Sequence, residues 1–82
     1  MGTLYMFYVY ILRNQITKQL YYGYTNNLER RVAEHNQDQQ KWELVYFEGY
    51  KAEIDARNRE RRLKHYAQAL TALKSRLKES LK

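Results

Sequence analysis

Residues 7–24 read F-Y-V-Y-I-L-R-N-Q-I-T-K-Q-L-Y-Y-G-Y, and this stretch predicts a β-hairpin. Aromatic and β-branched residues fill Phe7–Leu12 and return in Gln19–Tyr24, as is typical of strands. The polar residues of Asn14–Thr17 lie between the two runs and indicate a loop.

A four-residue loop at 14–17 predicts the register of this hairpin. It pairs Arg13 with Lys18 and sets Tyr10 directly opposite Tyr21, so that both tyrosines share one face of the sheet. The other face is the more apolar and is expected to pack against the core; it carries Phe7, Val9, Ile11, Leu20, Tyr22 and Tyr24.

The rest of the chain continues with a helix, a strand and further helix. Asparagine and threonine at 25–27 are N-cap candidates for a short helix that ends near Asn36. A polar loop follows, and W-E-L-V-Y-F-E at Trp42–Glu48 predicts a third strand that Gly49 ends. From Lys51 onward leucines and alanines recur at the helical period, in one long helix or in two with a bend near His65.

Composition limits the function classes. Fifteen Lys and Arg against nine Asp and Glu give the 82 residues a net charge of +6, which favours nucleic acid or an anionic membrane face as partner. A basic protein without such a partner has the same composition. There is no cysteine for a disulfide or a thiolate metal site.

Nothing in the sequence indicates a membrane span, a secretion signal or a linker. No apolar run reaches the roughly 18 residues that a span needs, and the first ten residues lack the basic start and uniform apolar run of a signal peptide. With no proline, low-complexity tract or repeat, residues 1–82 are expected to form a single cytoplasmic domain without a membrane partner.

The first helix places two polar side chains where apolar ones are expected. Leu28 and Val32 define its inward stripe, and Arg31 and His35 continue this stripe at helical spacing. Because burying such groups without partners is costly, they either reach the edge of the sheet with their polar ends or line a polar pocket. The solvent face is assigned Glu29, Arg30, Ala33 and Glu34.

The second helix repeats the pattern with a carboxylate. Ala52, Ala56 and Leu63 mark an apolar stripe, and Glu60 lies on it. The simpler interpretation is an exposed ion pair between Glu60 and Lys64, four residues apart. Agreement with the first helix favours a polar site instead.

Tyrosine, histidine, arginine and one carboxylate suffice for phosphodiester hydrolysis. A carboxylate binds Mg²⁺ together with waters and a substrate phosphate, an arginine stabilises charge on phosphorus, and Tyr or His transfers protons. One inward carboxylate disfavours a two-metal site, and two histidines without cysteine form no recognisable zinc set.

Five segments together resemble the GIY-YIG nuclease superfamily, and above all its small stand-alone members. They are Y-V-Y at 8–10, Y-Y-G at 21–23, T-x-x-L-x-x-R-x-x-x-H at 25–35, W-E-L-V-Y-F-E at 42–48 and A-x-x-x-E-x-x-L-K at 56–64. The resemblance implies an α+β fold of order β-β-α-β-α-α, with a three-stranded antiparallel sheet flanked by helices. It also implies a DNA endonuclease that uses a single Mg²⁺ or Mn²⁺ ion and acts in DNA repair or recombination.

The resemblance assigns a role to each candidate site residue. Tyr10 and Tyr21 take the places of the tyrosines in the first and second motifs, and the second is a candidate general base. Arg31 corresponds to the family arginine that contacts the scissile phosphate, and His35 to a member of the proton network. Glu60 corresponds to the glutamate that binds the metal.

The sequence departs from the family pattern in two places; the first is a variation that small members tolerate, and the second, together with the net charge of +6, motivates another function. Tyr8 and Tyr22 replace the first-motif glycine and the second-motif isoleucine, and the connection over 36–41 is shorter and less basic than usual. One alternative is a non-catalytic nucleic-acid-binding module on the same scaffold. Another is self-association, as a homodimer, through the leucine-lined C-terminal helix, and a targeting partner protein is compatible with each function.

Overall fold

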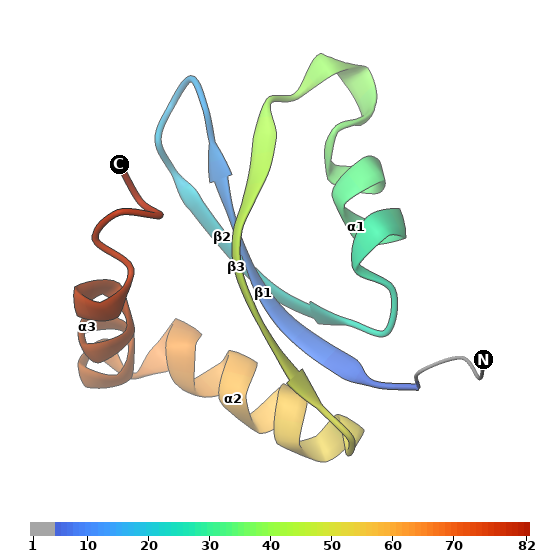
Figure 1. The fold of residues 1–82 in the computed structure, drawn as a ribbon, viewed down its shortest axis with the longest axis vertical. Coiled ribbons are helices and arrows are strands. Elements are labelled where there is room, and N and C mark those ends of the chain that lie inside the picture. The colour runs from blue at the N-terminus through green and yellow to red at the C-terminus, as the bar shows by residue number, and fades with distance from the viewer. Residues whose placement is uncertain (1–4) are drawn as a thin grey trace.

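The computed structural model describes residues 5–82, except for the side chain of Asp38. Its sheet has three antiparallel strands in the order β2-β1-β3 (Figure 1). The strands are β1 (Phe7–Asn14), β2 (Leu20–Thr25) and β3 (Trp42–Tyr50). The helices are α1 (Leu28–His35), a 3-10 turn (Gln37–Gln39), α2 (Glu53–His65) and α3 (Ala67–Arg76). The α+β fold and its element order are confirmed.

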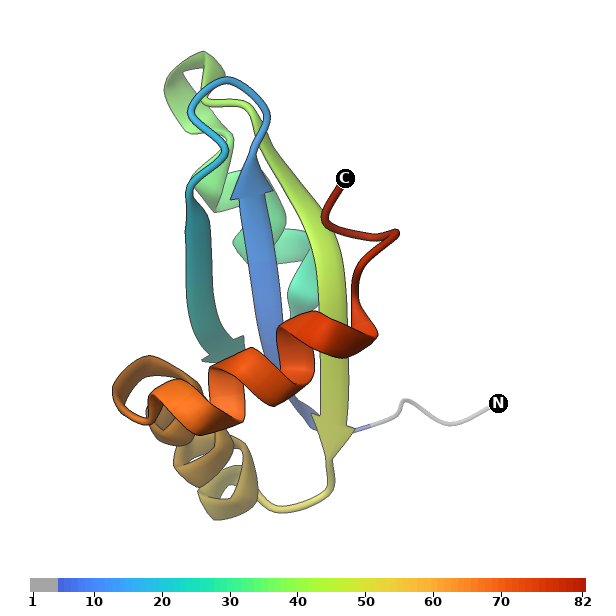
Figure 2. The same cartoon turned by 90° about the vertical axis from the view of Figure 1, so that its left-hand side faces the viewer.

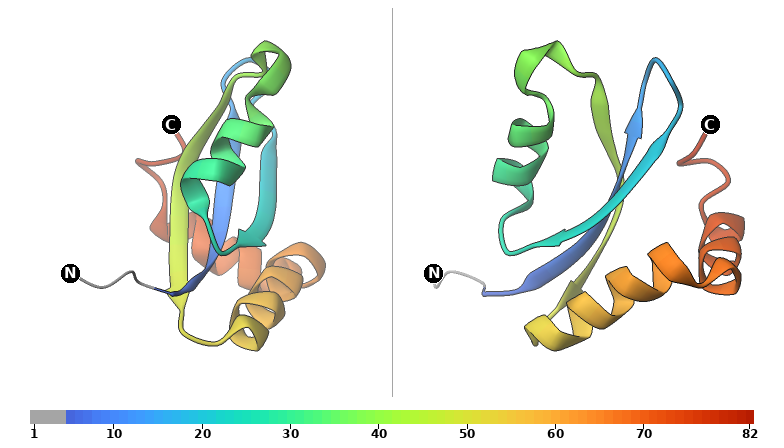
Figure 3. Two further views of the ribbon diagram at one scale, coloured as in Figure 1. Left: turned by 90° about the vertical axis from the view of Figure 1, so that its right-hand side faces the viewer. Right: turned by 180° about the vertical axis from the view of Figure 1, so that it is seen from behind.

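The helices cover the two faces of the sheet unequally. Helix α1 lies on one face, and α2 and α3 lie on the other, as the side views show (Figures 2 and 3). Helix α2 packs on β1 and β2, whereas α1 approaches β3. No helix in the described part of the chain is long and apolar enough to cross a membrane.

The predicted hairpin register is wrong by two residues. Tyr10 pairs with Gly23, and Tyr21 pairs with Leu12, whereas the prediction set the two tyrosines opposite each other. Because side chains alternate with a period of two, a shift by two keeps each one on its predicted face. Tyr10 and Tyr21 therefore remain on one face as diagonal neighbours.

The turn residue Asn14 explains this shift. It stays in β1, and its side-chain Oδ1 accepts hydrogen bonds from the backbone N–H groups of Ile16 (2.9 Å) and Thr17 (3.0 Å). Its own N–H donates to the Gln19 carbonyl at 2.8 Å, and Lys18 takes a left-handed conformation with φ 66°. The loop begins one residue later than predicted because asparagine organises such turns through its side chain.

The predicted apolar face of the hairpin does form the core. Val9 and Ile11 are fully buried together with Ala56 and Leu63 of α2 and Leu73 of α3. Leu77 is also buried in this cluster, and partly buried neighbours complete it, among them Phe7, Leu20, Tyr22, Tyr24 and Leu81. Leu63, Leu73 and Leu77 of the C-terminal region therefore pack within the chain, and self-association through this region stays a prediction.

Two boundary predictions are corrected. Gly49 does not end β3, which continues to Tyr50, because Gly49 pairs with Tyr8. A Cβ on Gly49 would lie 3.4 Å from the Tyr8 ring, an ordinary contact, so neither a turn nor close packing requires glycine here. Ala52 is exposed and precedes α2, so it does not belong to the buried stripe of that helix.

The C-terminal region consists of two helices. Of the two predicted alternatives, one long helix or two with a bend near His65, the second is confirmed. The two helices meet at Tyr66, whose extended backbone (φ −121°, ψ 103°) interrupts the helical hydrogen bonds. Helix α3 then turns back across the sheet (Figure 2). This turn brings Leu73 against the same core as Leu63.

Candidate functional site

Tyr10 lies at the centre of the polar face of the sheet. It is completely buried, and its hydroxyl is 3.2 Å from His35 Nε2 and accepts a hydrogen bond from Arg31 Nε at 3.4 Å. When His35 carries its proton on Nδ1, the Tyr10 hydroxyl donates to Nε2. One phenol thus joins the two polar residues of α1 into a chain of hydrogen bonds.

Gly23 makes room for the Tyr10 side chain. The two residues pair across β1 and β2, and a Cβ on Gly23 would lie 2.5 Å from the Tyr10 hydroxyl oxygen. No substituted residue fits there unless the phenol moves. The glycine of the second motif is therefore needed to seat the hydroxyl beside Arg31 and His35.

Helix α1 delivers Arg31 and His35 to this hydroxyl. The helix is capped by Asn27, whose Oδ1 accepts from the Arg30 N–H at 3.1 Å. The predicted inward stripe is confirmed, since Arg31 and His35 are half-buried together with Leu28 and Val32, and the predicted outward residues are exposed. Arg31 also pairs with Glu34 at 2.8 Å, so its guanidinium lies at the rim of the site.

Aromatic rings surround His35. The Tyr21 ring lies 4.4 Å from the imidazole between centroids, and the Trp42 ring lies 6.3 Å from it. Asn36 fixes this arrangement because its side chain accepts from the Trp42 N–H at 2.7 Å and donates to the Trp42 carbonyl at 2.9 Å. The end of α1 is thereby attached to the start of β3, and the imidazole is held beside Tyr21.

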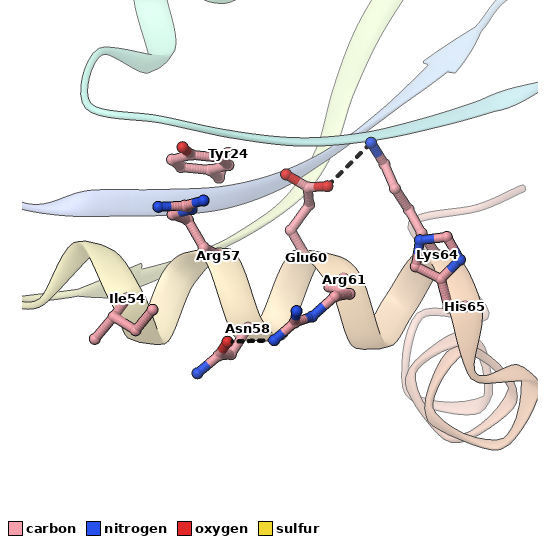
Figure 4. A pocket seen from close by; sticks show the side chains of 8 residues that line it. All are labelled: Tyr24, Ile54, Arg57, Asn58, Glu60, Arg61, Lys64 and His65. Atoms are coloured by element: carbon pink, nitrogen blue, oxygen red, sulfur yellow. Dashed lines mark hydrogen bonds and ion pairs between the residues drawn. The ribbon is translucent and has the colours of Figure 1, made fainter.

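Glu60 approaches the same region from α2. Its side chain is 17% exposed and pairs with Lys64 at 3.0 Å, and both side chains point from α2 toward the strands (Figure 4). The Lys64 ammonium lies 6.0 Å from the centroid of the Tyr21 ring. The carboxylate is near enough for its charge to act on Tyr10. The structure therefore brings Glu60 near Tyr10 directly and near Tyr21 through Lys64.

The protonation equilibria follow from burial and from Arg31. Burial raises the pKa of Tyr10, the hydrogen bond and the charge of Arg31 oppose this, and the Glu60 carboxylate adds a smaller increase. Burial and the Arg31 charge lower the pKa of His35. At neutral pH the phenol is protonated and can donate a proton, whereas the neutral imidazole can accept one.

One carboxylate is available for a cation. Among residues 5–82, no three His, Cys, Asp or Glu side chains gather as a metal-ligand cluster. A partly exposed glutamate still fits Mg²⁺, which keeps several waters and binds proteins through one or two carboxylates plus substrate phosphate. The Lys64 ammonium lies next to this carboxylate at 3.0 Å, so a bound cation would compete with it for Glu60.

Comparison with known proteins assigns the class. Residues 6–74 match the family model of the GIY-YIG catalytic domain, and the chain therefore belongs to the GIY-YIG family. Domains of this family are generally endonucleases and typically use a divalent metal. A UPF0213 protein of Clostridium perfringens (strain 13 / Type A) is 39% identical over 74 residues, covering 80% of this chain and 74% of that protein. No solved structure shows a significant match.

Three residues join the site that the sequence interpretation left outside it. Lys64 was considered only as an ion-pair partner on a solvated surface, although its spacing from Glu60 was visible. Trp42 was interpreted as a packed strand residue, but its ring borders both Tyr21 and His35. The Asn36 side chain gave no signal, because its two bonds to Trp42 depend on the path of the chain between α1 and β3.

Proposed function

We propose that this protein hydrolyses phosphodiester bonds in DNA as a divalent-metal-dependent endonuclease, in DNA repair or recombination. The observation that supports the proposal is the hydrogen-bonded chain of Arg31, Tyr10 and His35, with the Glu60 carboxylate of α2 near enough for its charge to act on Tyr10. Basic, proton-transferring and metal-binding groups thereby meet on one side of the molecule.

Each of the five residues has a proposed task. Glu60 would hold the Mg²⁺ or Mn²⁺ ion, which when bound polarises a phosphate oxygen and lowers the pKa of water. Arg31 binds the scissile phosphate, because its guanidinium reaches the rim while its Nε is fixed on Tyr10. Tyr21 serves as general base: it takes a proton from the attacking water while its own hydroxyl proton passes to the neutral imidazole of His35, which packs against its ring and is held by the Tyr10 hydroxyl.

Nicking of labelled duplex and branched DNA tests this proposal directly. Activity is expected with Mg²⁺ or Mn²⁺ and none with chelator, and Glu60→Gln is expected to lower the rate by about 10²–10³-fold. Asp55→Asn is the matched control, since Asp55 is an exposed carboxylate on the same helix. Cleavage that is equally fast in Glu60→Gln and Asp55→Asn would contradict the site assignment.

The Glu60–Lys64 ion pair supports a second candidate function. A carboxylate neutralised by its own lysine at 3.0 Å binds a cation less readily, and the chain then acts as a nucleic-acid-binding module without catalysis. That function predicts salt-sensitive binding and no turnover in Mg²⁺, Mn²⁺, Co²⁺ or Ni²⁺. Metal-dependent cleavage by the purified protein would exclude it.

A further inference from the structure

A basic cavity lies along α2 beside the candidate site. Its volume is about 420 Å³, and its walls include Tyr24 of β2 and, on α2, Arg57, Glu60, Arg61 and Lys64 (Figure 4). The three cationic residues follow one another at helical spacing, so they project along the same side of the helix. Glu60 is the one carboxylate of the lining.

Two of these cations have no carboxylate partner of their own. Among the described residues, Arg57 forms no ion pair, and Arg61 donates to the neutral amide of Asn58 at 2.8 Å. Lys64 offsets Glu60, which leaves the charges of Arg57 and Arg61 in excess in the cavity. Unpaired guanidinium groups gathered in a concave site attract anions and match phosphate geometry.

Tyr24 connects this cavity to the predicted phosphate-binding arginine. Its ring also lines a second cavity of about 340 Å³, whose walls include Arg30 and Arg31. The two cavities thus adjoin the same tyrosine, one with Arg31 and the other with Glu60. Glu34 and Glu53 also line the second cavity and offset its two arginines, so the excess positive charge beside Tyr24 lies on the α2 side.

We infer that the α2 cavity binds a backbone phosphate of the nucleic acid, next to the phosphate that Arg31 contacts. Arg57 and Arg61 supply the guanidinium contacts, and the Tyr24 ring separates the two phosphate positions. This inference rests on the proposed function, which places the scissile phosphate at Arg31 and so sets the path of the nucleic acid past Tyr24. It adds a binding site that the five predicted residues do not include.

Charge-neutral substitutions on one helix test the site. Arg57→Gln and Arg61→Gln are compared with Arg62→Gln, which removes the same charge from an exposed position of α2 that lines a different cavity, with Tyr66. Affinity for a 20-base-pair duplex is measured by fluorescence anisotropy in chelator over a series of salt concentrations. Melting curves confirm that all three exposed substitutions leave the fold intact.

Each lost phosphate contact lowers the slope of log affinity against log salt by about 0.9, which corresponds to about eightfold weaker binding at 0.1 M salt. We expect this change for Arg57→Gln and for Arg61→Gln, and less than a twofold change for Arg62→Gln. Equal behaviour of the three variants would overturn the inference, because it would reduce the effect to net charge.

The outcomes separate this inference from the proposed function. Binding is measured without metal and does not require cleavage, so a protein that never cuts DNA still shows the slope change if the α2 cavity holds a phosphate. Conversely, the wild-type protein could cleave DNA with metal while the three variants show the same salt dependence of duplex affinity. That result would support the proposed function and exclude the α2 phosphate site.

Discussion

Two clusters of tyrosine, arginine and glutamate lie on opposite faces of the sheet. On the face that carries α2, Glu48 accepts hydrogen bonds from Tyr46 and Tyr50 and a two-pronged pair from Arg59, at 2.9 and 3.1 Å. We call this the Glu48 cluster. Every carboxylate oxygen has at least two donors, and the group attaches α2 to β3.

The cluster around Tyr10 differs in each respect. Its contacts are long, 3.2 Å to His35 and 3.4 Å to Arg31, and its carboxylate, Glu60, stands apart with one lysine. Each oxygen of the Glu48 carboxylate accepts two hydrogen bonds, whereas Glu60 has a single lysine partner. Similar residue types thus stabilise the fold in one place and remain available for chemistry in the other.

The largest expected effect is on the cleavage rate, and it distinguishes Arg31 from its neighbour Arg30. Arg31→Ala should lower the cleavage rate by about 10²-fold or more, because it removes charge stabilisation at the phosphate, while the unfolding free energy changes by less than about 0.5 kcal/mol. Rates under single-turnover conditions and urea unfolding give the two quantities. Arg30→Ala is the control, since Arg30 is 60% exposed and shares the partner Glu34. An Arg31 variant that cleaves as fast as the Arg30 variant would break the comparison.

Glu48→Gln should show the opposite pattern. Losing one acceptor charge leaves the donors of Arg59 and of two tyrosines under-satisfied, which costs about 2 kcal/mol of unfolding free energy. Cleavage at a temperature where the variant is folded should fall by less than about tenfold. Circular dichroism during urea titration measures the unfolding free energy. If Glu48→Gln were as stable as wild type, the Glu48 cluster would not hold α2 on the sheet.

Gly23→Ala probes the space around Tyr10. A methyl 2.5 Å from the hydroxyl oxygen forces the phenol away from Arg31 and His35, with a cost of about 1–3 kcal/mol in stability and a drop of about tenfold in cleavage. Gly49→Ala is the matched glycine control on β3, where a Cβ would meet the flexible end of Met6 at 3.0 Å. Equal cleavage by both variants would argue against a role for the Tyr10 hydroxyl.

Acid should weaken the Glu48 cluster in a defined pH window. Burial alone would raise the pKa of Glu48, but hydrogen bonds from Arg59, Tyr46 and Tyr50 outweigh it and hold that pKa below its usual range. The unfolded chain, with an ordinary glutamate pKa of about 4.3, then binds the proton first. The stabilisation is present above that pH and is lost as pH falls through the folded pKa.

Urea midpoints at pH 6, 4.5 and 3.5 test this window. The difference in stability between wild type and Glu48→Gln should shrink toward the lowest pH, as the carboxylate of the folded protein takes up its proton. A difference that stays constant from pH 6 to 3.5 would mean that Glu48 has an ordinary pKa in the folded state.

The smallest expected effect concerns Lys64. Its pair with Glu60 joins neighbouring helical positions and is partly solvated, so it contributes about 0.3–0.5 kcal/mol. Lys64→Met should therefore tighten Mn²⁺ binding by about twofold, measured by electron paramagnetic resonance of free Mn²⁺. Weaker Mn²⁺ binding in this variant would show that Lys64 supports the metal site instead of competing with it.

Periodicity in the sequence predicted most of this arrangement. The stripes of α1 placed Arg31 and His35 correctly, because helical spacing determines direction once two apolar positions are known. The alternation in the hairpin placed Tyr10 and Tyr21 on one face even though the register was wrong. That register depended on Asn14, whose hydrogen bonds to a turn have no counterpart in a hydrophobic pattern.

Long-range packing determined what the sequence did not predict. The approach of Glu60 to Tyr10 depends on how α2 crosses β1 and β2, and the Glu48 cluster depends on pairing between β3 and α2. Neither follows from spacing along one element. Arg59 is next to Glu60 in the chain but pairs with Glu48 in the Glu48 cluster. The different roles of these two neighbours follow from tertiary packing and not from the sequence.

A crystal grown with Mn²⁺ and a phosphorothioate duplex that resists cleavage tests the central claim most directly. The Tyr10 cluster is proposed to bind a metal and a scissile phosphate together. The predicted result is anomalous density at the Glu60 carboxylate, with a backbone phosphate contacted by Arg31. Mn²⁺ bound away from Glu60, or a duplex lying on the face of α3, would contradict it.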